Sequence, residues 1–567
     1  MEFKAYLAEK IAGALREAFD ASVDGIPGFL ETPPNPEMGD FAFPCFRLSK
    51  ALRMAPPAIA GKLSERIAPD PVIERVECVG GYLNFFLHKT GYAQSIVERV
   101  LEQGERYGSS DEGQGRVICI DYSSINIAKR FHIGHLSTTM IGNALYKIYE
   151  HLGYKCVGIN HLGDWGTQFG KMIAAYRKWG SPEQVEQGGV NALTELYVRF
   201  HKEAETDPAL EDEGRLWFKK IEDGDPEALR IFNKFKEITL KDAQRVYDML
   251  GVQFDSYAGE SFYNDKMQPV IDELREKGLL KESQGAYVVD LEDEGMPPCL
   301  ILKKDGATLY ATRDLAAAFY RKKTYDFYKD LYVVAYQQDL HFRQWFKVVE
   351  KMGYNWAKDL EHVAFGMVSY EGRALSTREG YVVYLDELLT RAVEKAREII
   401  EEKSPNLADK DKVARQVGIG AVVFFDLFNN RIKDIDFRWE RVLNFDGETG
   451  PYVQYTHARC CSVLAKAGEL SAAPDYAALD NAQAQEVVRS LERFPELVRE
   501  ACQRNEPSLL TRFTVELASN FNRYYYENRI LTEDAAASAA RVNLTAATAS
   551  CLRTALGLIG VEAPEKM

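Results

Sequence analysis

A β-rich run, a polar loop and a long amphipathic segment follow one another directly between residues 117 and 152. Residues 117–122 have the composition of a strand, and in residues 136–152 the apolar side chains recur at helical spacing. In a parallel α/β sheet, such a junction lies at the carboxyl ends of the strands, where backbone N–H groups and the positive end of the helix favour a phosphate. The junction therefore predicts a nucleotide site.

The loop ends in the sequence His-Ile-Gly-His at residues 132–135. His132 and His135 lie one helical turn apart, so both can donate hydrogen bonds to an α-phosphate as negative charge builds up on it. Gly134 has no Cβ and allows a flat base to come close. Two such histidines are also half of a metal site, but no third ligand clusters near them and the cysteines form no Cys-x-x-Cys pair. We therefore predict no zinc.

The wider pattern predicts an α/β protein of three parts. From residue 109 to 385 strands and helices alternate, as a Rossmann-like doubly wound parallel sheet requires in a catalytic domain, with a charged helical insertion at about 182–281. Residues 1–108 mix helical segments with a strand and end in a polar, Gly-rich link, which predicts a small α+β module. Residues 386–567 are helical almost throughout, which predicts an α-helical bundle.

Composition favours a cytoplasmic protein. The 567 residues contain nine cysteines, an odd number without the spacing of a disulfide framework, which fits a reducing compartment. No apolar run is long enough to span a membrane, and residues 1–21 have the pattern of neither a signal nor a transit peptide, so we expect no membrane partner. The net charge of −15 disfavours nucleic acid on its own, although local basic faces on an acidic protein can bind RNA.

Three further blocks accompany the loop: Asn-His-Leu-Gly-Asp-Trp-Gly-Thr-Gln-Phe-Gly at 160–170, Tyr-Ala-Thr-Arg-Asp at 310–314 and Gly-Pro-Tyr-Val-Gln-Tyr at 450–455. With these motifs the chain resembles the class I aminoacyl-tRNA synthetases, and among them the arginyl-tRNA synthetases. The resemblance covers essentially the whole chain, to the closing Ala-Pro-Glu-Lys-Met at 563–567. It implies that L-arginine, ATP and tRNA(Arg) are the partners and that Mg²⁺ accompanies ATP. It further implies a monomer in which activation of arginine waits for bound tRNA.

A guanidinium is a planar fork of donors without acceptors, so a site that selects arginine needs carboxylate and carbonyl oxygens. The resemblance implies four residues for the pocket that holds the substrate side chain: Glu260, Tyr310, Asp314 and Gln338. It implies three residues for the α-amino and carboxylate ends of the substrate: Ser124, Asn126 and His135. For each acidic residue, a surface ion pair of little energetic value is the alternative.

The segment Ala-Leu-Ser-Thr-Arg at 374–378 departs from the family pattern, because most class I synthetases carry a Lys-Met-Ser-Lys-Ser loop there and both lysines are absent. The resemblance implies that Lys129, just upstream of His132, supplies the missing charge to ATP. We also expect Ser376 and Arg378 at the nucleotide, with Arg373 as a further candidate; solvated loop charges are the alternative. A second departure concerns the loop itself, in which two positions lack the prolines frequent in the family: Ile125 and Arg130.

Aromatic and arginine side chains mark the carboxyl-terminal part as a candidate RNA-binding surface. Tyr452 and Arg459 lie two turns apart on one predicted helix face, and Tyr525 precedes another tyrosine at 526. Splayed anticodon bases stack on such side chains, whereas an aromatic stripe that packs in the core is the alternative. The resemblance implies that this domain reads the anticodon, that Met567 lies near it, and that Tyr82 and Asn84 of the amino-terminal module contact the D-loop.

Three hypotheses follow for the function. The first is an arginine–tRNA ligase that forms arginyl-adenylate from arginine and ATP and transfers the arginyl group to tRNA. The second is a small-molecule nucleotidyltransferase, which has no use for a helical domain as large as residues 386–567. The third is a non-catalytic tRNA-binding paralogue, which the missing loop lysines suggest and the retained His132, His135 and Asp314 oppose.

Overall fold

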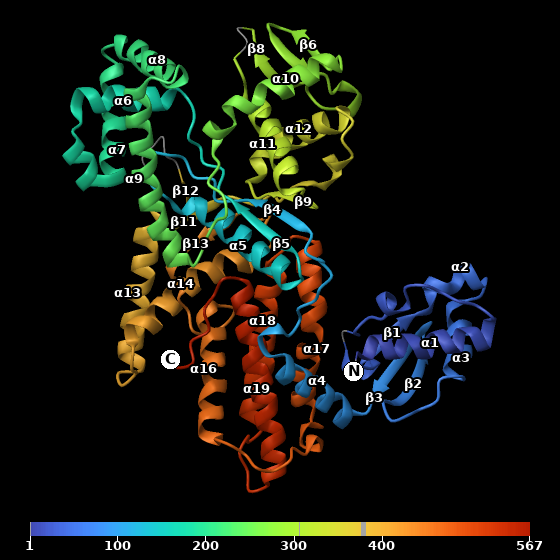
Figure 1. Ribbon diagram of the computed structural model, residues 1–567. Coiled ribbons are helices and arrows are strands. Elements are labelled where there is room, and N and C mark those ends of the chain that lie inside the picture. The colour runs from blue at the N-terminus through green and yellow to red at the C-terminus, as the bar shows by residue number, and fades with distance from the viewer. Residues whose placement is uncertain (1, 34, 305–306, 376–381) are drawn as a thin grey trace. The chain divides into compact units, whose positions relative to one another are not determined.

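The computed structural model describes residues 2–33, 35–304, 307–375 and 382–567 (Figure 1). The described chain forms two compact units, both discontinuous in sequence. The first unit consists of the residues up to Tyr107 together with Arg459–Phe494 and Glu516–Cys551. The second unit comprises three segments: Gly108–Ala458, Pro495–Val515 and Leu552–Met567.

The amino-terminal part of the first unit is an α+β module, which confirms the prediction of its fold. Its antiparallel sheet has the order β1-β3-β2, and Leu83 and Phe85 in the central strand β3 are fully buried. The strands are β1 Phe41–Pro44, β2 Ile73–Val79 and β3 Tyr82–Leu87. The helices are α1 Phe3–Phe19, α2 Ser49–Leu52, α3 Pro56–Ser64 and α4 Lys89–Gln103.

The second unit contains the predicted parallel sheet, with the strand order β10-β9-β4-β5. Its strands are β4 Val117–Asp121, β5 Lys155–Ile159, β9 Lys329–Tyr332 and β10 Leu360–His362. Helix α5 (Leu136–His151) connects β4 to β5, and the chain then returns to the other side of β4, so the strand order reverses between β4 and β9. Ligands of doubly wound sheets bind at the carboxyl ends of the strands at such a reversal.

Helices cover both faces of this sheet (Figure 1). On one face, Cys119 and Val157 pack in a buried cluster with Leu315 and Trp345 of the helices α11 (Tyr310–Tyr325) and α12 (Asp339–Lys351). On the other face lies α5, which contacts β4 and β5. Successive strand residues point to opposite faces, so a strand that is covered on both sides is apolar throughout.

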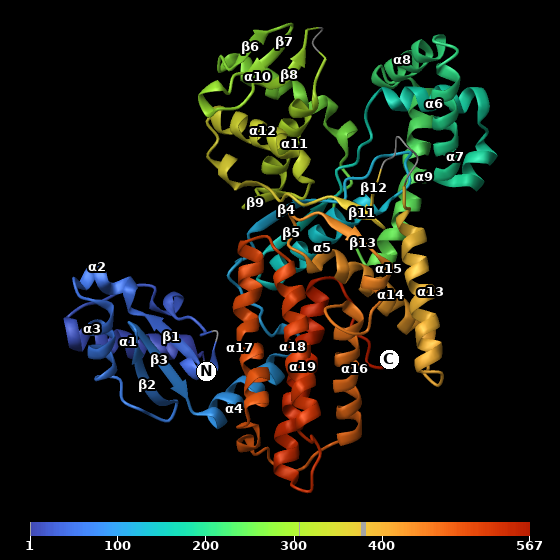
Figure 2. The ribbon, with the colours of Figure 1, turned by 180° about the vertical axis from the view of Figure 1, so that it is seen from behind.

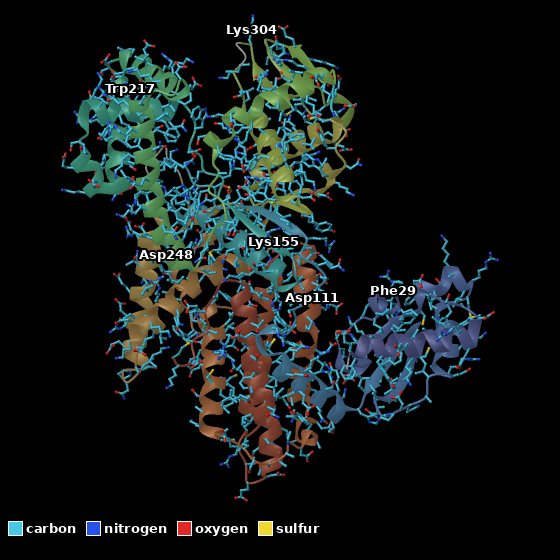
Figure 3. All side chains as sticks on the ribbon, viewed as in Figure 1. Phe29, Asp111, Lys155, Trp217, Asp248 and Lys304 are labelled. Atoms are coloured by element: carbon cyan, nitrogen blue, oxygen red, sulfur yellow. The ribbon has the colours of Figure 1, made fainter. Side chains whose placement is uncertain are left out.

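The helical insertion follows β5, and Figure 2 shows it from behind. Its helices are α6 Thr167–Trp179, α7 Pro182–Ala204, α8 Ala209–Glu222 and α9 Pro226–Leu250. Asp225 caps α9 by accepting hydrogen bonds from the N–H groups of Glu227 and Ala228, and proline follows the cap. Trp217 of α8, labelled in Figure 3, is only 5% exposed. Beyond it come α10 (Met267–Glu276) and a small antiparallel sheet of three strands: β6 Leu280–Ser283, β7 Ala286–Val289 and β8 Cys299–Lys303.

The segment after β10 forms a second small sheet and two long helices. Strand β11 (Val368–Tyr370) pairs with β12 (Arg373–Ala374) and, in parallel, with β13 (Ile435–Phe437). Strand β13 lies in a region that the sequence predicts to be almost wholly helical, and its three residues are too few to produce a visible alternation. The two helices are α13 Leu385–Lys403 and α14 Lys410–Phe428, followed by the short α15 Trp439–Val442.

Four long helices close the chain and confirm the predicted helical bundle. They are α16 Gly450–Ala467, α17 Ala482–Gln503, α18 Ser508–Glu527 and α19 Ala535–Leu558. Each of them has residues in both compact units. The three-part division at residues 108 and 385 therefore stays a prediction, and the compact units group the chain differently.

Candidate active site

The loop between β4 and α5 leaves the sheet through a tight bend. Ser123 and Ser124 have φ angles of 67° and 44°, and Ala128 has a φ of 62°, although none of them is glycine. Hydrogen bonds hold this conformation, because Ser123 N–H donates to Thr138 Oγ1 (3.0 Å) and Ser124 Oγ donates to Asp121 Oδ1 (2.8 Å). A strained backbone that its surroundings hold in place is typical of functional sites.

His132 and His135 lie against each other where the loop meets α5, with 4.0 Å between their ring centroids. Gly134 N–H donates to His132 Nδ1 (3.1 Å), so the neutral ring of His132 carries its proton on Nε2. Burial, and next the charge of Lys129, lowers the pKa of His132 to about 4, and burial lowers the pKa of His135 to about 3. Both rings are therefore neutral near pH 7, and His132 Nε2–H is a hydrogen-bond donor.

Helix α9 of the insertion supports this loop. Tyr247 OH lies 2.8 Å from Ser123 Oγ and accepts a hydrogen bond from Asn160 Nδ2 (2.8 Å). Ala128 N–H donates to Thr239 Oγ1 (2.9 Å). Tyr247 and Thr239 are each 1% exposed. The insertion is thus part of the framework of the site, which the sequence analysis did not foresee.

The loop and the second motif meet at Asn126 and Gly163. Gly163 N–H donates to Ile125 O (2.9 Å), and Ile127 N–H donates to Gly163 O (3.1 Å). A Cβ on Gly163 would lie 2.3 Å from Asn126 Oδ1. Glycine at this position therefore leaves the space that the Asn126 amide occupies.

Asp164 joins the second motif to Glu260. The Asp164 carboxylate is fully buried, lies 2.7 Å from Lys236 Nζ, and accepts hydrogen bonds from the N–H (2.8 Å) and Oγ (2.7 Å) of Ser261. Glu260 N–H donates to Leu162 O (2.9 Å). These contacts fix the position of the Glu260 backbone.

Glu260 is partly buried, and the charged groups of Arg313, Asp314 and Asp164 lie near it; we call this group of residues the acidic pocket. Burial raises the pKa of Glu260 to about 7, although Arg313, whose Nη1 is 3.9 Å from Glu260 Oε2, opposes the rise. The nearby carboxylates of Asp314 and Asp164 raise this pKa further. A cationic ligand would restore the ionised form of Glu260, so the pocket is suited to a positively charged group.

The other residues expected in the arginine pocket lie at the starts of two helices. Tyr310 begins α11 and is 72% exposed, and Gln338 precedes the first residue of α12 and is exposed. Asp314 Oδ2 lies 2.5 Å from His341 Nε2, a contact that the sequence analysis missed. The available signal was the position of His341 one helical turn after Gln338, in the same motif.

The structure describes only two of the four further residues that are expected to bind the ATP phosphates. Lys129 and Arg373 are exposed, whereas Ser376 and Arg378 lie outside the described residues. Leu375 and Val383, which lie on either side of residues 376–381, lie beside the loop between β4 and α5. Leu375 Cδ1 lies 3.9 Å from the position of a Cβ on Gly134, and Ile133 N–H donates to Val383 O (2.9 Å).

Arg459 lies in an aromatic cluster of the first unit. Its Cζ is 5.2 Å from the ring centroids of both Tyr525 and Tyr526, and its Nη2 donates to Tyr526 OH (3.2 Å). Its Nη1 donates to Asn522 Oδ1. Because Tyr526 is 74% exposed, this cluster offers an aromatic surface with a cation to a stacking partner.

The remaining tRNA candidates are in different surroundings. Tyr452 is half-buried in α16, and Met567 is half-buried against the apolar cluster that Ile400 and Val413 of α13 and α14 help to form. Tyr82, at the start of β3, is 36% exposed. Asn84 is only 3% exposed, because both faces of β3 are covered after Tyr82, so an RNA contact through its side chain is not supported.

Among the residues that the structure describes, no group of three or more His, Cys, Asp and Glu side chains is arranged to hold a metal ion. No described helix is both long and apolar enough to cross a membrane.

Three segments of the chain match known families. The family described as class I (R) tRNA synthetases, catalytic domain, matches residues 96–439. The arginyl-tRNA synthetase N-terminal domain matches residues 5–87, and the DALR anticodon-binding domain matches residues 453–567.

Curated relatives match nearly the full chain. An arginine–tRNA ligase of Alkaliphilus metalliredigens is 55% identical over 539 residues, which is 95% of each chain. One of Clostridioides difficile is 54% identical over 559 residues, or 98% of this chain and 99% of that one. Among solved structures, the arginyl-tRNA synthetase of Thermus thermophilus has a TM-score of 0.84 at 28% identity and covers 100% of both chains. That of Plasmodium falciparum, at 23% identity, shares the fold with a TM-score of 0.81 over 100% of this chain and 99% of that one.

Proposed function

Because the chain belongs to the class I arginyl-tRNA synthetases and is an arginine–tRNA ligase, we propose that it activates arginine at the carboxyl edge of its parallel sheet. One observation carries this proposal: a continuous series of contacts runs from the histidine loop to the acidic pocket. Asn126 lies against Gly163, and Asp164, the next residue, holds the backbone beside Glu260. These contacts support a nucleotide site and an arginine site at one edge of the sheet.

The acidic pocket is proposed to bind the guanidinium of arginine. Glu260 and Asp314 supply carboxylates that accept its N–H donors, and Tyr310 and Gln338 close the pocket. The α-amino and carboxylate ends of the substrate are proposed to contact Ser124, Asn126 and His135.

In the first step, the arginine carboxylate attacks the α-phosphate of ATP, and pyrophosphate leaves. His132 and His135 stabilise the charge that develops on the α-phosphate, and Gly134 lets the adenine approach. Lys129 and Arg378 are proposed to neutralise the charge of the β- and γ-phosphates, and Ser376 to bind the nucleotide beside them. In the second step, a terminal ribose hydroxyl of tRNA attacks the arginyl carbonyl, and AMP leaves.

Mg²⁺ is proposed to enter with ATP and to be bound mainly through phosphate oxygens. One observation supports this: Asp121, a carboxylate next to the loop, is already engaged by Arg321 (2.6 Å) and Ser124 (2.8 Å). The side chains proposed for the phosphates include no carboxylate. We propose no zinc.

For tRNA(Arg), we propose that the carboxyl-terminal helices read the anticodon through Arg459, Tyr525 and Tyr452, with Met567 nearby. Tyr82 is the proposed contact to the D-loop. The division into residues 1–108, 109–385 and 386–567, the monomeric state and the cytoplasmic location belong to the same proposal.

The test is arginine-dependent exchange of pyrophosphate into ATP, with and without tRNA(Arg), using lysine and citrulline as controls. We expect exchange only with arginine and tRNA together. Exchange without tRNA would contradict tRNA-gated activation alone, whereas no exchange under any condition would contradict activation at this site. The relatives do not favour the non-catalytic paralogue or the small-molecule nucleotidyltransferase, since the relatives that match over at least 95% of their length are arginine–tRNA ligases.

A further inference from the structure

Arg130 joins the loop that carries His132 to the start of helix α13. Its Nη2 atom lies 3.0 Å from Asp386 Oδ1, 3.1 Å from Asp386 Oδ2 and 2.9 Å from Glu387 Oε1. Its Cζ lies 3.6 Å from the ring centroid of Tyr384. Arg130 and Asp386 are 256 positions apart in the sequence, so these contacts connect two distant segments.

The ion pair between Arg130 and Asp386 is shielded from solvent, with side-chain exposures of 14% and 24%. Glu387, at 64%, is open to solvent and contributes less. The stacking of the guanidinium on Tyr384 restricts its orientation and adds a cation–π attraction. Together these contacts hold Arg130 more firmly than an exposed ion pair would.

The same two segments also pair through their backbones. Ile133 N–H donates to Val383 O (2.9 Å), and Leu385 N–H donates to Phe131 O (3.0 Å). The Arg130 side chain therefore completes a junction between the loop and the residues just before α13.

Lys129 lies between two tethers of the loop. On one side, Ala128 N–H donates to Thr239 Oγ1 (2.9 Å), and on the other Arg130 is bound to Asp386. Lys129 itself is exposed. Loss of the Arg130 side-chain contacts would therefore remove the tether next to Lys129, while the backbone hydrogen bonds of Phe131 and Ile133 remain.

We propose that Arg130 is a positioning residue for the activation of arginine: through Asp386 and Tyr384 it fixes Lys129 and His132 relative to the sheet edge. This inference rests on the proposed function of the loop. A displacement of about 1 Å at a reacting centre can lower a rate about 100-fold. Because the tether acts on the groups proposed for the phosphates, its loss affects the use of ATP and spares the acidic pocket for arginine.

The experiment compares Arg130→Met, Arg130→Lys and Asp386→Asn with wild type in tRNA-dependent ATP–pyrophosphate exchange. A cavity of about 360 Å³ adjoins Arg130 and Asp386, so these variants fit without overpacking. The matched control is Arg116→Met, because Arg116 also stacks on a tyrosine, with 4.1 Å from its Cζ to the Tyr328 centroid, but lies just before β4, at the opposite end from the loop.

For Arg130→Met we expect kcat/KM for ATP to fall by roughly 10- to 100-fold, with KM for arginine within about twofold and the thermal midpoint close to that of wild type. Arg130→Lys should keep part of the activity that Arg130→Met loses. The double variant Arg130→Met/Asp386→Asn should be no worse than Arg130→Met alone, because both substitutions remove the same interaction. Arg116→Met should match wild type.

Wild-type ATP parameters in Arg130→Met would overturn the inference. An equal rise in KM for ATP and arginine with a lowered thermal midpoint would also overturn it, because that is the effect of a general loss of structure. A wild type without exchange would instead contradict the proposed function, so the two failures are distinguishable.

Discussion

His341 Nε2 lies 2.5 Å from Asp314 Oδ2, and the two residues come from the neighbouring helices α12 and α11. Both side chains are about one-quarter exposed. The contact gives the Asp314 carboxylate a fixed partner on one oxygen, and the other oxygen is the one that we propose to accept from the guanidinium of arginine.

His341→Ala should therefore weaken arginine binding, because Asp314 loses the partner that orients it. We expect KM for arginine to rise by about tenfold, the effect typical of a lost charge-assisted hydrogen bond, with KM for ATP little changed. Steady-state exchange at varied arginine and varied ATP measures both. A larger effect on ATP than on arginine would contradict this role.

Gly163→Ala should disturb the amide of Asn126 without unfolding the protein. The new Cβ would lie 2.3 Å from Asn126 Oδ1, the far end of a short side chain that can rotate away. We expect a loss of roughly tenfold in kcat/KM for arginine, since misplaced positioning groups slow the reaction. Gly557→Ala, where a Cβ meets nothing within 4 Å, is the control. Equal activities of the two variants would contradict the role of Asn126.

The affinity for arginine should rise with pH and level off above about pH 7. Burial raises the pKa of Glu260 to about 7, so below that pH Glu260 is protonated in most molecules. Arginine can then pair with Glu260 only after the carboxyl loses its proton. Well below this pKa, each pH unit should change the affinity by up to about tenfold. Calorimetry in two buffers of different ionisation enthalpy measures the proton released on binding. Glu260→Gln should bind weakly with a flat pH profile; a persistent slope would assign the titration elsewhere.

Arg321→Met should destabilise the protein strongly. Arg321 is 1% exposed and lies between two buried carboxylates, with 2.6 Å to Asp121 Oδ2 and 3.6 Å to Asp330 Oδ1. Removing the cation leaves two buried acids uncompensated, at a cost of about 3–5 kcal/mol. Urea unfolding measures the change, and Asp330→Asn in the same background should recover part of it. Arg215→Met, which removes an ion pair with 64% and 77% exposed side chains, should leave the urea midpoint close to that of wild type.

The sequence predicted the parts of this fold that local patterns determine. The strand expected at 117–122 is β4 Val117–Asp121, and the helix expected at 136–152 is α5 Leu136–His151. Both patterns are strong, because a buried parallel strand is a nearly continuous apolar run and an amphipathic helix repeats every 3.6 residues. The three-residue strand β13 has no such pattern, since its pairing with β11 comes from a distant segment.

The contacts that support the site could not be predicted from the sequence. Tyr247 and Thr239 lie in α9, whose sequence has the pattern of an ordinary amphipathic helix. Their hydrogen bonds to Ser123 and Ala128 form only when α9 packs on the loop. The burial of Asn84 could not be predicted for a similar reason, because the residues that surround its side chain belong to elements other than β3. The motif residues were recognisable by resemblance alone, and their catalytic roles stay predictions.

Lys129 lies in the loop at which we propose that arginine is activated with ATP. The most direct measurement is single-turnover formation of arginyl-adenylate by Lys129→Ala with tRNA(Arg) bound, together with the affinity for that tRNA. We predict a rate reduced by about 100-fold or more, as for the loss of one group that stabilises transition-state charge, with tRNA affinity within about twofold of wild type. A wild-type rate in Lys129→Ala would contradict the account.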